Sequence, residues 1–352
     1  MNSDSLYLRD AVRQILSSDA ESNDRSIEWT PRVWSALTDA GMTTVGIDEG
    51  AGGSGGALTD AATVIREAAW ASTPIPIAET SVLAGWLLSS AGLDIPAGPL
   101  SCGWSSSEPP RLRRSASGWV LDGRLDSVPW ASVVTHLAVL ARDTEGTSYA
   151  ALVPASLIAI DHRPNIAGEP GGSCRFDDVA LPEHAVRPAD RNIDEFALEV
   201  RGALFRTIGI DGALGRVLEL CVDYAKQRQQ FGRPIAQFQA IQQQLVVLAG
   251  EAAAAAAACD AALAAYEADS RQWQPVALAK IRAGEAVTTS TAIAHQVFGA
   301  IGISLEHTLQ RYTRRLWAWR DEYGTEAWWA GTLTESASTW ESFWNTATKT
   351  LS

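Results

Sequence analysis

Residues around one predicted helix end have the types and spacing to hold a phosphate-bearing ligand. Arg228 stands three residues before Phe231 and Gly232, and the chain then turns, because glycine relaxes the backbone and Pro234 cannot donate inside a helix. A guanidinium beside such a turn suits a diphosphate, since it can bind two oxygens at once. Gly299 would let backbone amides come close to the same kind of anion. A plain surface ion pair at Arg228 remains the alternative.

A second set of cations lies nearer the C-terminus, at Arg311, Arg314, Arg315 and Arg320. Such a cluster can hold phosphates even on an acidic protein. A solvated or ion-paired helix face explains the same residues equally well, and both interpretations stay open.

Hydrophobic spacing predicts the helices that position these groups. Apolar residues recur at i, i+3, i+4 and i+7 over Val217–Ala225, which indicates a buried helical stripe. A second, alanine-rich helix is predicted from near Ile235 to about Asp269, a rod of roughly 50 Å that needs partners on several sides. Further helices are predicted over Pro275–His295, over Ser304–Arg320 and after Thr325, the last carrying Trp328, Trp329, Trp340 and Trp344.

The first and middle parts of the chain differ in their hydrophobic spacing. Helical spacing covers residues 5–18, the stretch after Thr30-Pro31, and residues 59–71 and 77–91, with a glycine-rich loop over 43–56. From Pro96 to about Pro188, short β-rich runs alternate with turns, at 118–121, 133–140, 149–153 and 174–181. We predict a mostly α protein with a small middle antiparallel β-domain: an N-terminal helical domain (1–97), the β-domain (98–190) and a C-terminal four-helix bundle (191–352).

Composition narrows the class of function. The 352 residues are 46% hydrophobic and 20% charged, as in ordinary soluble proteins, and the net charge of -13 argues against nucleic acid but not against an anionic CoA ligand. We expect no membrane association, because no apolar run reaches the length of a membrane span and residues 1–10 lack the order of a signal peptide. The four cysteines are predicted to be buried free thiols rather than disulfides or metal ligands, which favours a cytoplasmic location.

Four motifs resemble those of the acyl-CoA dehydrogenases, flavoenzymes that oxidise acyl-CoA thioesters. They are Arg228-x-x-Phe231-Gly232 followed by Phe238–Ile241, the turn Gln296–Gly302 (with Ala300 in place of one glycine), the strand Phe176–Pro182, and the N-terminal stretch Trp34–Gly56. Together they span almost the whole chain in the family's order. The resemblance implies the three-domain fold above and a tetramer assembled through the C-terminal bundle.

The resemblance also implies an FAD site built from two subunits. In it, Arg228 meets the flavin pyrophosphate of a neighbouring subunit and Phe231 packs near the adenine end. Gln296 and Gly299 line the same dinucleotide, and Gln239 belongs to the same motif as Arg228. No metal is implied.

Two features of the β-domain depart from the family pattern. The long loop usual there is cut down to Cys102–Ser107, and the Trp-x-Thr at the flavin edge is replaced by a segment that ends in Trp130. Trp130 is predicted to contact the flavin, displaced along the strand, although a core tryptophan would give the same pattern.

The catalytic base departs from the pattern too. Many family members carry a glutamate immediately before Gly-Thr, but an ungapped count from Arg228 places that position on Tyr323, with Glu322 one residue early. A one-residue offset re-aims a helical side chain by about 100°. We predict Glu322 as the base, with Asp321 or Glu326, or no base in this chain, as open alternatives. Gly202, near a second base position of some relatives, offers no carboxylate.

Three hypotheses on function follow from the resemblance. The first is an FAD-dependent acyl-CoA dehydrogenase that desaturates the α,β bond of a bulky or steroid-type acyl-CoA, with an electron-transferring flavoprotein as acceptor. The second is a non-catalytic or FAD-lending subunit of a hetero-oligomeric dehydrogenase, so that the tetramer is homo- or hetero-oligomeric. The third keeps the fold for a flavin oxidase or monooxygenase.

Overall fold

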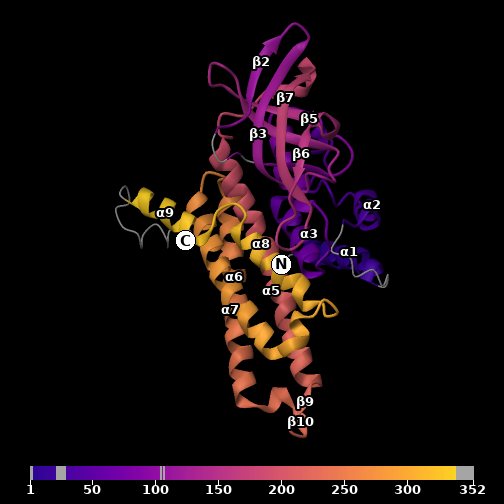
Figure 1. The fold of residues 1–352 in the computed structure, drawn as a ribbon, viewed down its shortest axis with the longest axis vertical. Coiled ribbons are helices and arrows are strands. Elements are labelled where there is room, and N and C mark those ends of the chain that lie inside the picture. Colours follow the sequence, from indigo (N-terminus) through magenta and orange to yellow (C-terminus); the bar gives the residue numbers. More distant parts are fainter. Residues whose placement is uncertain (1–2, 21–28, 104, 106–107, 338–352) are drawn as a thin grey trace. The chain divides into compact units, whose positions relative to one another are not determined.

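The computed structural model describes residues 3–20, 29–103, 105 and 108–337, which form two compact units (Figure 1). Unit 1 contains the chain up to Val64 together with Thr73–Arg201, and unit 2 contains Ile65–Ser72 and the chain from Gly202 onward. Trp104, Ser106, Ser107, Trp340 and Trp344 lie outside the described residues. The predicted architecture of N-terminal helices, middle sheet and long C-terminal helices is confirmed.

The N-terminal helices follow the predicted apolar spacing. They are α1 (Ser3–Ala20), α2 (Pro31–Asp39), α3 (Leu58–Trp70), which continues into unit 2, and α4 (Trp86–Ser90). Helix α2 begins with proline in its first turn, where a missing N–H costs nothing, and buries Val33 and Leu37. The helix predicted over 77–91 is present as a continuous helical segment, in which a buried π-helical turn (Glu79–Gly85) runs into α4.

An eight-stranded sheet forms the middle of unit 1. Its strands are β1 (Leu100–Cys102), β2 (Arg111–Ser115), β3 (Gly118–Pro129), β4 (His136–Arg142), β5 (Ser148–Pro154), β6 (Ala159–His162), β7 (Gly171–Leu181) and β8 (Val186–Pro188). The order is β6-β7-β3-β2-β4-β5-β8, with β1 beside β4. The sheet is mixed rather than purely antiparallel, because β1 and β2 both pair in parallel with β4. Short runs separated by turns do not reveal strand direction, so the sequence could not show this.

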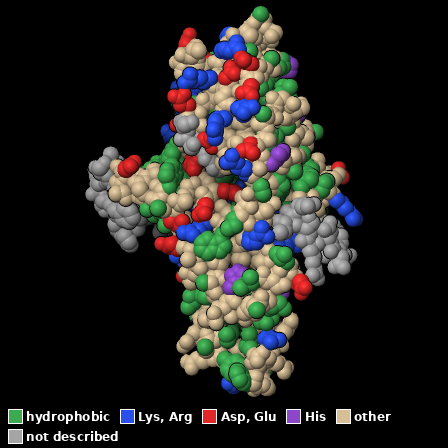
Figure 2. Space-filling view, in the orientation of Figure 1, with side chains coloured by type: hydrophobic (Ala, Val, Ile, Leu, Met, Phe, Trp, Pro, Cys, Tyr) green, Lys and Arg blue, Asp and Glu red, His purple; other side chains and the backbone are tan. Residues whose placement is uncertain are grey.

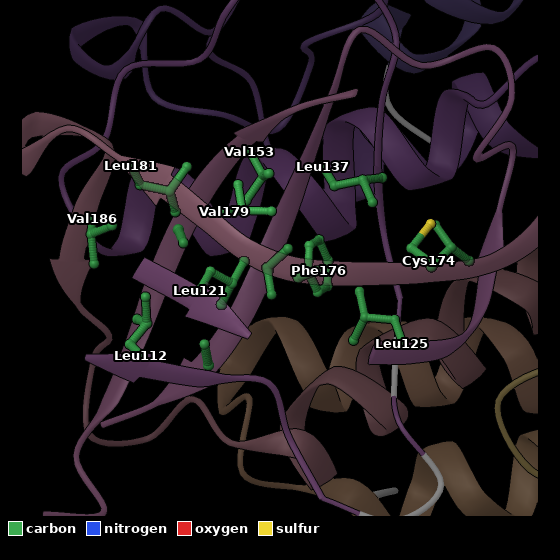
Figure 3. Packing of buried hydrophobic residues seen from close by; sticks show 14 of the residues in the cluster. Leu112, Leu121, Leu125, Leu137, Val153, Cys174, Phe176, Val179, Leu181 and Val186 are labelled. Carbon is green, nitrogen blue, oxygen red and sulfur yellow. The ribbon is translucent and has the colours of Figure 1, made fainter. Parts of the chain in front are cut away.

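The sheet folds around one apolar cluster (Figure 3). Phe176 lies between Leu121 and Leu125 and is 2% exposed. Buried positions on β7 alternate until Asp178, whose left-handed φ of 50° shifts the register. This β-bulge moves Val179 back onto the core face. All four cysteines of the chain are free and buried, as predicted, and burial raises the pKa of each thiol to about 12.

Unit 2 is built from long helices joined by short connections. They are α5 (Glu195–Gln227), which begins in unit 1, the hairpin β9 (Gln229–Gln230) and β10 (Arg233–Pro234), α6 (Gln239–Ala268), α7 (Trp273–Phe298), the 3-10 turn η6 (Gly299–Ile303), α8 (Leu309–Asp321) and α9 (Glu326–Ala337). Arg66, at the end of α3, donates to Asp211 on α5 and Asp260 on α6, both at 2.6 Å. This shared guanidinium fixes the spacing of those helices.

Helix α6 is apolar along much of its length, yet only 28% of its most apolar stretch is buried. By length and composition alone it could cross a membrane, which corrects the expectation that no apolar run is long enough. The evidence is weak, because a core helix of a soluble protein passes the same test. What stands out is an alanine-rich surface with little covering it within the chain.

Candidate functional site

The first candidate region is the end of unit 2 where α5 and α7 finish (Figure 1). The N–H of Arg228 donates to the carbonyl of Tyr224 one turn earlier, at 2.8 Å. The ring of Tyr224 stacks on Phe298 with centroids 4.3 Å apart. Because Phe298 directly precedes Gly299, this stack brings Arg228 and the glycine turn to the same end of the bundle. We call this region the hairpin end.

The hairpin itself is held by aromatic and cation–π contacts. The guanidinium of Arg233 lies 4.3 Å from the centre of the Phe238 ring, and Phe231 meets the same ring edge-on at 6.1 Å. Phe231 is nevertheless 93% exposed, with a left-handed φ of 52°. An exposed apolar ring on a strained backbone contributes little to the stability of the isolated chain.

The other predicted FAD residues are also open. Gln239 is the exposed first residue of α6, and Gln296 is exposed in the last turn of α7. Gly299 has φ 62° and ψ −147°, and a Cβ built there would meet no atom within 4 Å. The structure therefore brings Arg228, Phe231 and Gly299 to one end with their groups exposed. A guanidinium, two amides and a flat ring fit a dinucleotide.

His295 is a packed histidine. Its Nε2 lies 3.1 Å from Oγ1 of Thr313, and burial lowers its pKa below the ordinary value. The turn after it is different, because η6 and the residues that follow expose three large apolar side chains, those of Ile301, Ile303 and Leu305. Figure 2 shows hydrophobic patches over the part of unit 2 that carries the helices, whereas Lys, Arg, Asp and Glu intermingle over the strands of unit 1.

The second candidate region is the loop Asp321–Thr325 between α8 and α9, which we call the base loop. Tyr323, at the position expected for the base, is 4% exposed with a left-handed φ of 54°. Its ring packs against the backbone of Gly202 on α5. A Cβ added to Gly202 would lie 2.1 Å from Cδ1 of Tyr323. The two positions that the family resemblance links to catalysis thus face each other, one filled by a phenol and one kept empty.

Glu322 points to Arg206, one turn beyond Gly202 on α5. The guanidinium Nε donates to the carboxylate at 2.6 Å, and the side chains are only 9% (Arg206) and 16% (Glu322) exposed. One oxygen of this carboxylate is therefore already engaged by the guanidinium. Of the alternative bases, Glu326 is paired with Arg320, and Asp321 is exposed at the end of α8.

Two residues that the sequence analysis missed hold the base loop. Nζ of Lys280, on α7, donates to the carbonyls of Arg320 (2.6 Å) and Gly324 (2.8 Å), and the Trp329 indole donates to the Tyr323 carbonyl at 3.0 Å. Lys280 is 1% exposed, and burial is the main cause that lowers its pKa to about 8. The sequence held one signal, since Lys280 is one of only three lysines and sits in the apolar run Val276–Ala279.

The hairpin end and the base loop lie at opposite ends of α7. Lys280 and Gly299 are 19 residues apart, which corresponds to about 28 Å along a helix. In the C-terminal cation cluster, Arg315 donates to Ser72 at 2.6 Å and is 2% exposed, and Arg320 pairs with Glu326. Arg320 agrees with the ion-paired interpretation, and Arg315 is held inside the fold by the Ser72 hydroxyl.

Trp130, the predicted flavin contact of the β-domain, lies in the core of unit 1. It is 3% exposed, belongs to the apolar cluster of the sheet, and meets Trp29 edge-on at 6.4 Å. The backbone N–H of Trp130 donates to the Pro170 carbonyl at 2.6 Å. Flavin contact by this ring stays a prediction.

Comparison with known proteins agrees with the fold and with these motifs. The family description "Acyl-CoA dehydrogenase, N-terminal domain" matches residues 2–94, and "Acyl-CoA dehydrogenase, C-terminal domain" matches residues 202–335. The chain therefore belongs to the acyl-CoA dehydrogenase family.

Among its relatives, acyl-CoA dehydrogenase IpdE2 of Mycolicibacterium smegmatis is 28% identical over 312 residues, which covers 87% of this chain and 86% of that protein. Acyl-CoA dehydrogenase FadE34 of Mycobacterium tuberculosis is 29% identical over 301 residues, 82% of this chain but only 39% of that longer protein.

Two solved structures share the whole fold. The ChsE4–ChsE5 complex of Mycobacterium tuberculosis matches with a TM-score of 0.87 at 20% identity, over 97% of this chain and 99% of that one. The Tcur3481–Tcur3483 steroid acyl-CoA dehydrogenase matches with a TM-score of 0.81 at 21% identity, over 96% and 99%. At such low identity these matches establish the fold and nothing finer.

Proposed function

We propose that this chain is one subunit of a hetero-oligomeric FAD-dependent acyl-CoA dehydrogenase, and that it lends FAD contacts to a flavin whose ring lies in a related partner subunit. The observation that carries the proposal is the length of α7 between its two candidate regions. A diphosphate held at Arg228 lies about 28 Å along α7 from the loop that carries Glu322. The exposed groups at the hairpin end therefore serve a flavin that faces another chain's base.

The base loop supports the same division of labour. Tyr323 fills the space above Gly202, and Glu322 is held by Arg206, so this carboxylate is already paired within the chain. In the proposed assembly the partner's carboxylate removes the α proton, and a dry pocket there raises the basicity of that group.

The chain's own residues bind and orient the cofactor. The Arg228 guanidinium would hold the diphosphate, the amides of Gln239 and Gln296 would bind beside it, and Phe231 would cover the adenine end. FAD, when bound, supplies the acceptor for the hydride that leaves the β carbon. Members of this family bind FAD, and an electron-transferring flavoprotein is the proposed acceptor of the electrons.

The assembly and the substrate are proposed on separate grounds. The sparsely covered surface of α6 and the exposed apolar residues of η6 support association with a related subunit in a tetramer. The bulky, steroid-type acyl group is proposed from the motif resemblance in the sequence, since the likeness to the steroid acyl-CoA dehydrogenase establishes the fold alone.

A second candidate is a self-sufficient dehydrogenase with Glu322 as base. One observation favours it: Glu322 is a carboxylate in a nearly dry cluster directly beside Gly202 and Tyr323. In that case release from Arg206 would expose the base to the α proton.

The test compares the purified chain with the chain mixed with the related product of a neighbouring gene. We expect a colourless or weakly yellow chain alone, and a yellow mixture that acyl-CoA bleaches. Glu322→Gln should leave bleaching by the mixture intact. If Glu322→Gln abolishes bleaching while the yellow colour remains, the second candidate replaces the first. A yellow chain that acyl-CoA bleaches without a partner would do the same.

The cofactor contact is tested in the same mixture with Arg228→Ala. Loss of a charge-assisted contact to phosphate, about 1.5–3 kcal/mol, should weaken flavin binding on the order of 10- to 100-fold without unfolding the chain. Arg233→Ala is the matched control, since that guanidinium covers Phe238 in the same turn. Equal flavin content in Arg228→Ala and the unmodified protein after gel filtration would contradict the role of Arg228.

A further inference from the structure

The base loop ends a helix in an unusual way. Carbonyls in the last turn of a helix have no partner within it, and water or a cap usually satisfies them. Here a single buried ammonium does so, because Nζ of Lys280 donates to the carbonyls of Arg320 and Gly324 on either side of the loop. Glu322 and Tyr323 lie between these two anchor points. Their directions are therefore set from α7 rather than by the loop itself.

Charged side chains meet around this ammonium from every helix that packs on the loop. They are the cations Lys280, Arg206 and Arg320 and the carboxylates Asp321, Glu322 and Glu326. Three positive and three negative charges sum to zero while Lys280 keeps its proton. Loss of that proton leaves one net negative charge in a largely buried cluster. The electrostatic attraction that holds the carboxylates in place is then weaker.

The residue type matters as much as its place. Of the 28 basic residues in the chain, lysines occur only at 226, 280 and 349. Arginine, the common cation here, keeps its proton at any physiological pH, whereas a buried lysine can release it. At the centre of this cluster the chain carries the one cation type whose charge can change.

We propose that Lys280 is the positioning residue of the base loop: its protonated amine clamps the carbonyls of Arg320 and Gly324, keeps Glu322 on Arg206 and keeps Tyr323 over Gly202. Deprotonation replaces two charge-assisted hydrogen bonds by weaker neutral ones and frees the carboxylates electrostatically. The loop is thereby firm below a pH near 8 and looser above it. The inference concerns the order of the loop itself and holds whichever subunit supplies the base.

The small number of lysines makes the proton directly observable. In protein with ¹³C-labelled lysine side chains, the Lys280 signal is the one missing from Lys280→Met, and Lys226→Met is the matched control at an exposed site. We expect a titration midpoint for Lys280 near pH 8. Glu322→Gln should lower that midpoint further, because it removes a carboxylate that favours the charged amine. A midpoint near that of free lysine, or one that ignores Glu322→Gln, would overturn the proposal.

The loop itself is followed by amide hydrogen exchange over residues 321–325, which does not depend on the subunit that supplies the base. Protection of these amides, corrected for the pH dependence of intrinsic exchange, should fall along a limb centred near pH 8, and this limb should vanish in Lys280→Met and persist in Lys226→Met. A limb that survives in Lys280→Met refutes a positioning role. Should Lys280→Met fail to fold, the titration in the unmodified and Glu322→Gln proteins still decides. If the assembly never bleaches at any pH, the proposed function fails, whereas the lysine titration is unaffected.

Discussion

Unit 2 contains two turns with the same backbone conformation, one exposed and one buried. Phe231-Gly232 at the hairpin end has φ values of 52° and 79°, and Tyr323-Gly324 in the base loop has 54° and 87°. In both places an aromatic residue takes the left-handed conformation, at a cost of roughly 1–2 kcal/mol, and glycine follows. Phe231 is 93% exposed, whereas Tyr323 is 4% exposed.

The surroundings explain how each strained residue persists. Tyr323 is fixed on three sides, by the backbone of Gly202, by the Trp329 indole on its carbonyl, and by Lys280 on the next carbonyl. Among the described residues, the ring contact of Phe231 is the edge of Phe238. Backbone strain that contacts within the chain do not offset indicates that a ligand or a partner subunit binds at this turn. The buried turn belongs to the fold, and the exposed turn fits a ligand and a partner subunit.

The largest expected effect comes from truncating the two rings. Tyr323→Ala should destabilise the chain by about 3 kcal/mol or more, because a large buried ring leaves a cavity over Gly202. Phe231→Ala should change stability by less than about 0.5 kcal/mol, as at other exposed sites. Urea unfolding of the two variants measures the difference, and Tyr323→Phe is the control that keeps the ring. Similar losses in both variants would erase the distinction between the two turns.

Local signals in the sequence predicted much of this fold. The apolar spacing and Pro31 placed α2, and Arg228 with Phe231-Gly232 placed the end of α5 within a residue or two. Helix α8 begins at Leu309, not at Ser304, because η6 extends the turn after Gly299. The exposed candidate residues of the hairpin end were found through motif resemblance, which is local in sequence and requires no contact within the chain.

The base loop escaped prediction because its contacts are distant in sequence. Arg206 and Glu322 are 116 residues apart, and Lys280 reaches carbonyls 40 and 44 residues away. No periodic spacing in the sequence connects residues so far apart. A hydrogen bond to a backbone carbonyl also places no requirement on the type of the accepting residue, so the sequence does not show it. The packing of Tyr323 on Gly202 was likewise hidden, although the sequence correctly showed that neither position carries a carboxylate.

The second prediction concerns the pH dependence of stability at Lys280. Its folded pKa of about 8 lies below the ordinary value of 10.5. Below pH 8 lysine is protonated in both states, but between 8 and 10.5 the unfolded chain binds more protons, so stability rises with pH. The unmodified chain should gain up to about 3 kcal/mol relative to Lys280→Met across this interval.

Urea unfolding at pH 7.5 and 10 measures this gain, and Lys226→Met should follow the unmodified chain. Global stability is expected to rise over the same interval in which the electrostatic hold on the base loop weakens. A constant difference between the unmodified chain and Lys280→Met would show that Lys280 keeps an ordinary proton affinity.

The smallest expected effect tests the exposed turn in the opposite direction. Phe231→Gly should stabilise the isolated chain by about 0.5–1 kcal/mol, because relief of the left-handed strain exceeds the entropy that glycine adds to the unfolded chain. Phe231→Ala keeps the strain and should show no such gain. In the flavin-loaded assembly both variants should lose flavin more readily, since both lack the ring. If the isolated Phe231→Gly chain is less stable than the unmodified chain, the Phe231 ring already stabilises the fold. The two turns would then differ only in their solvent exposure.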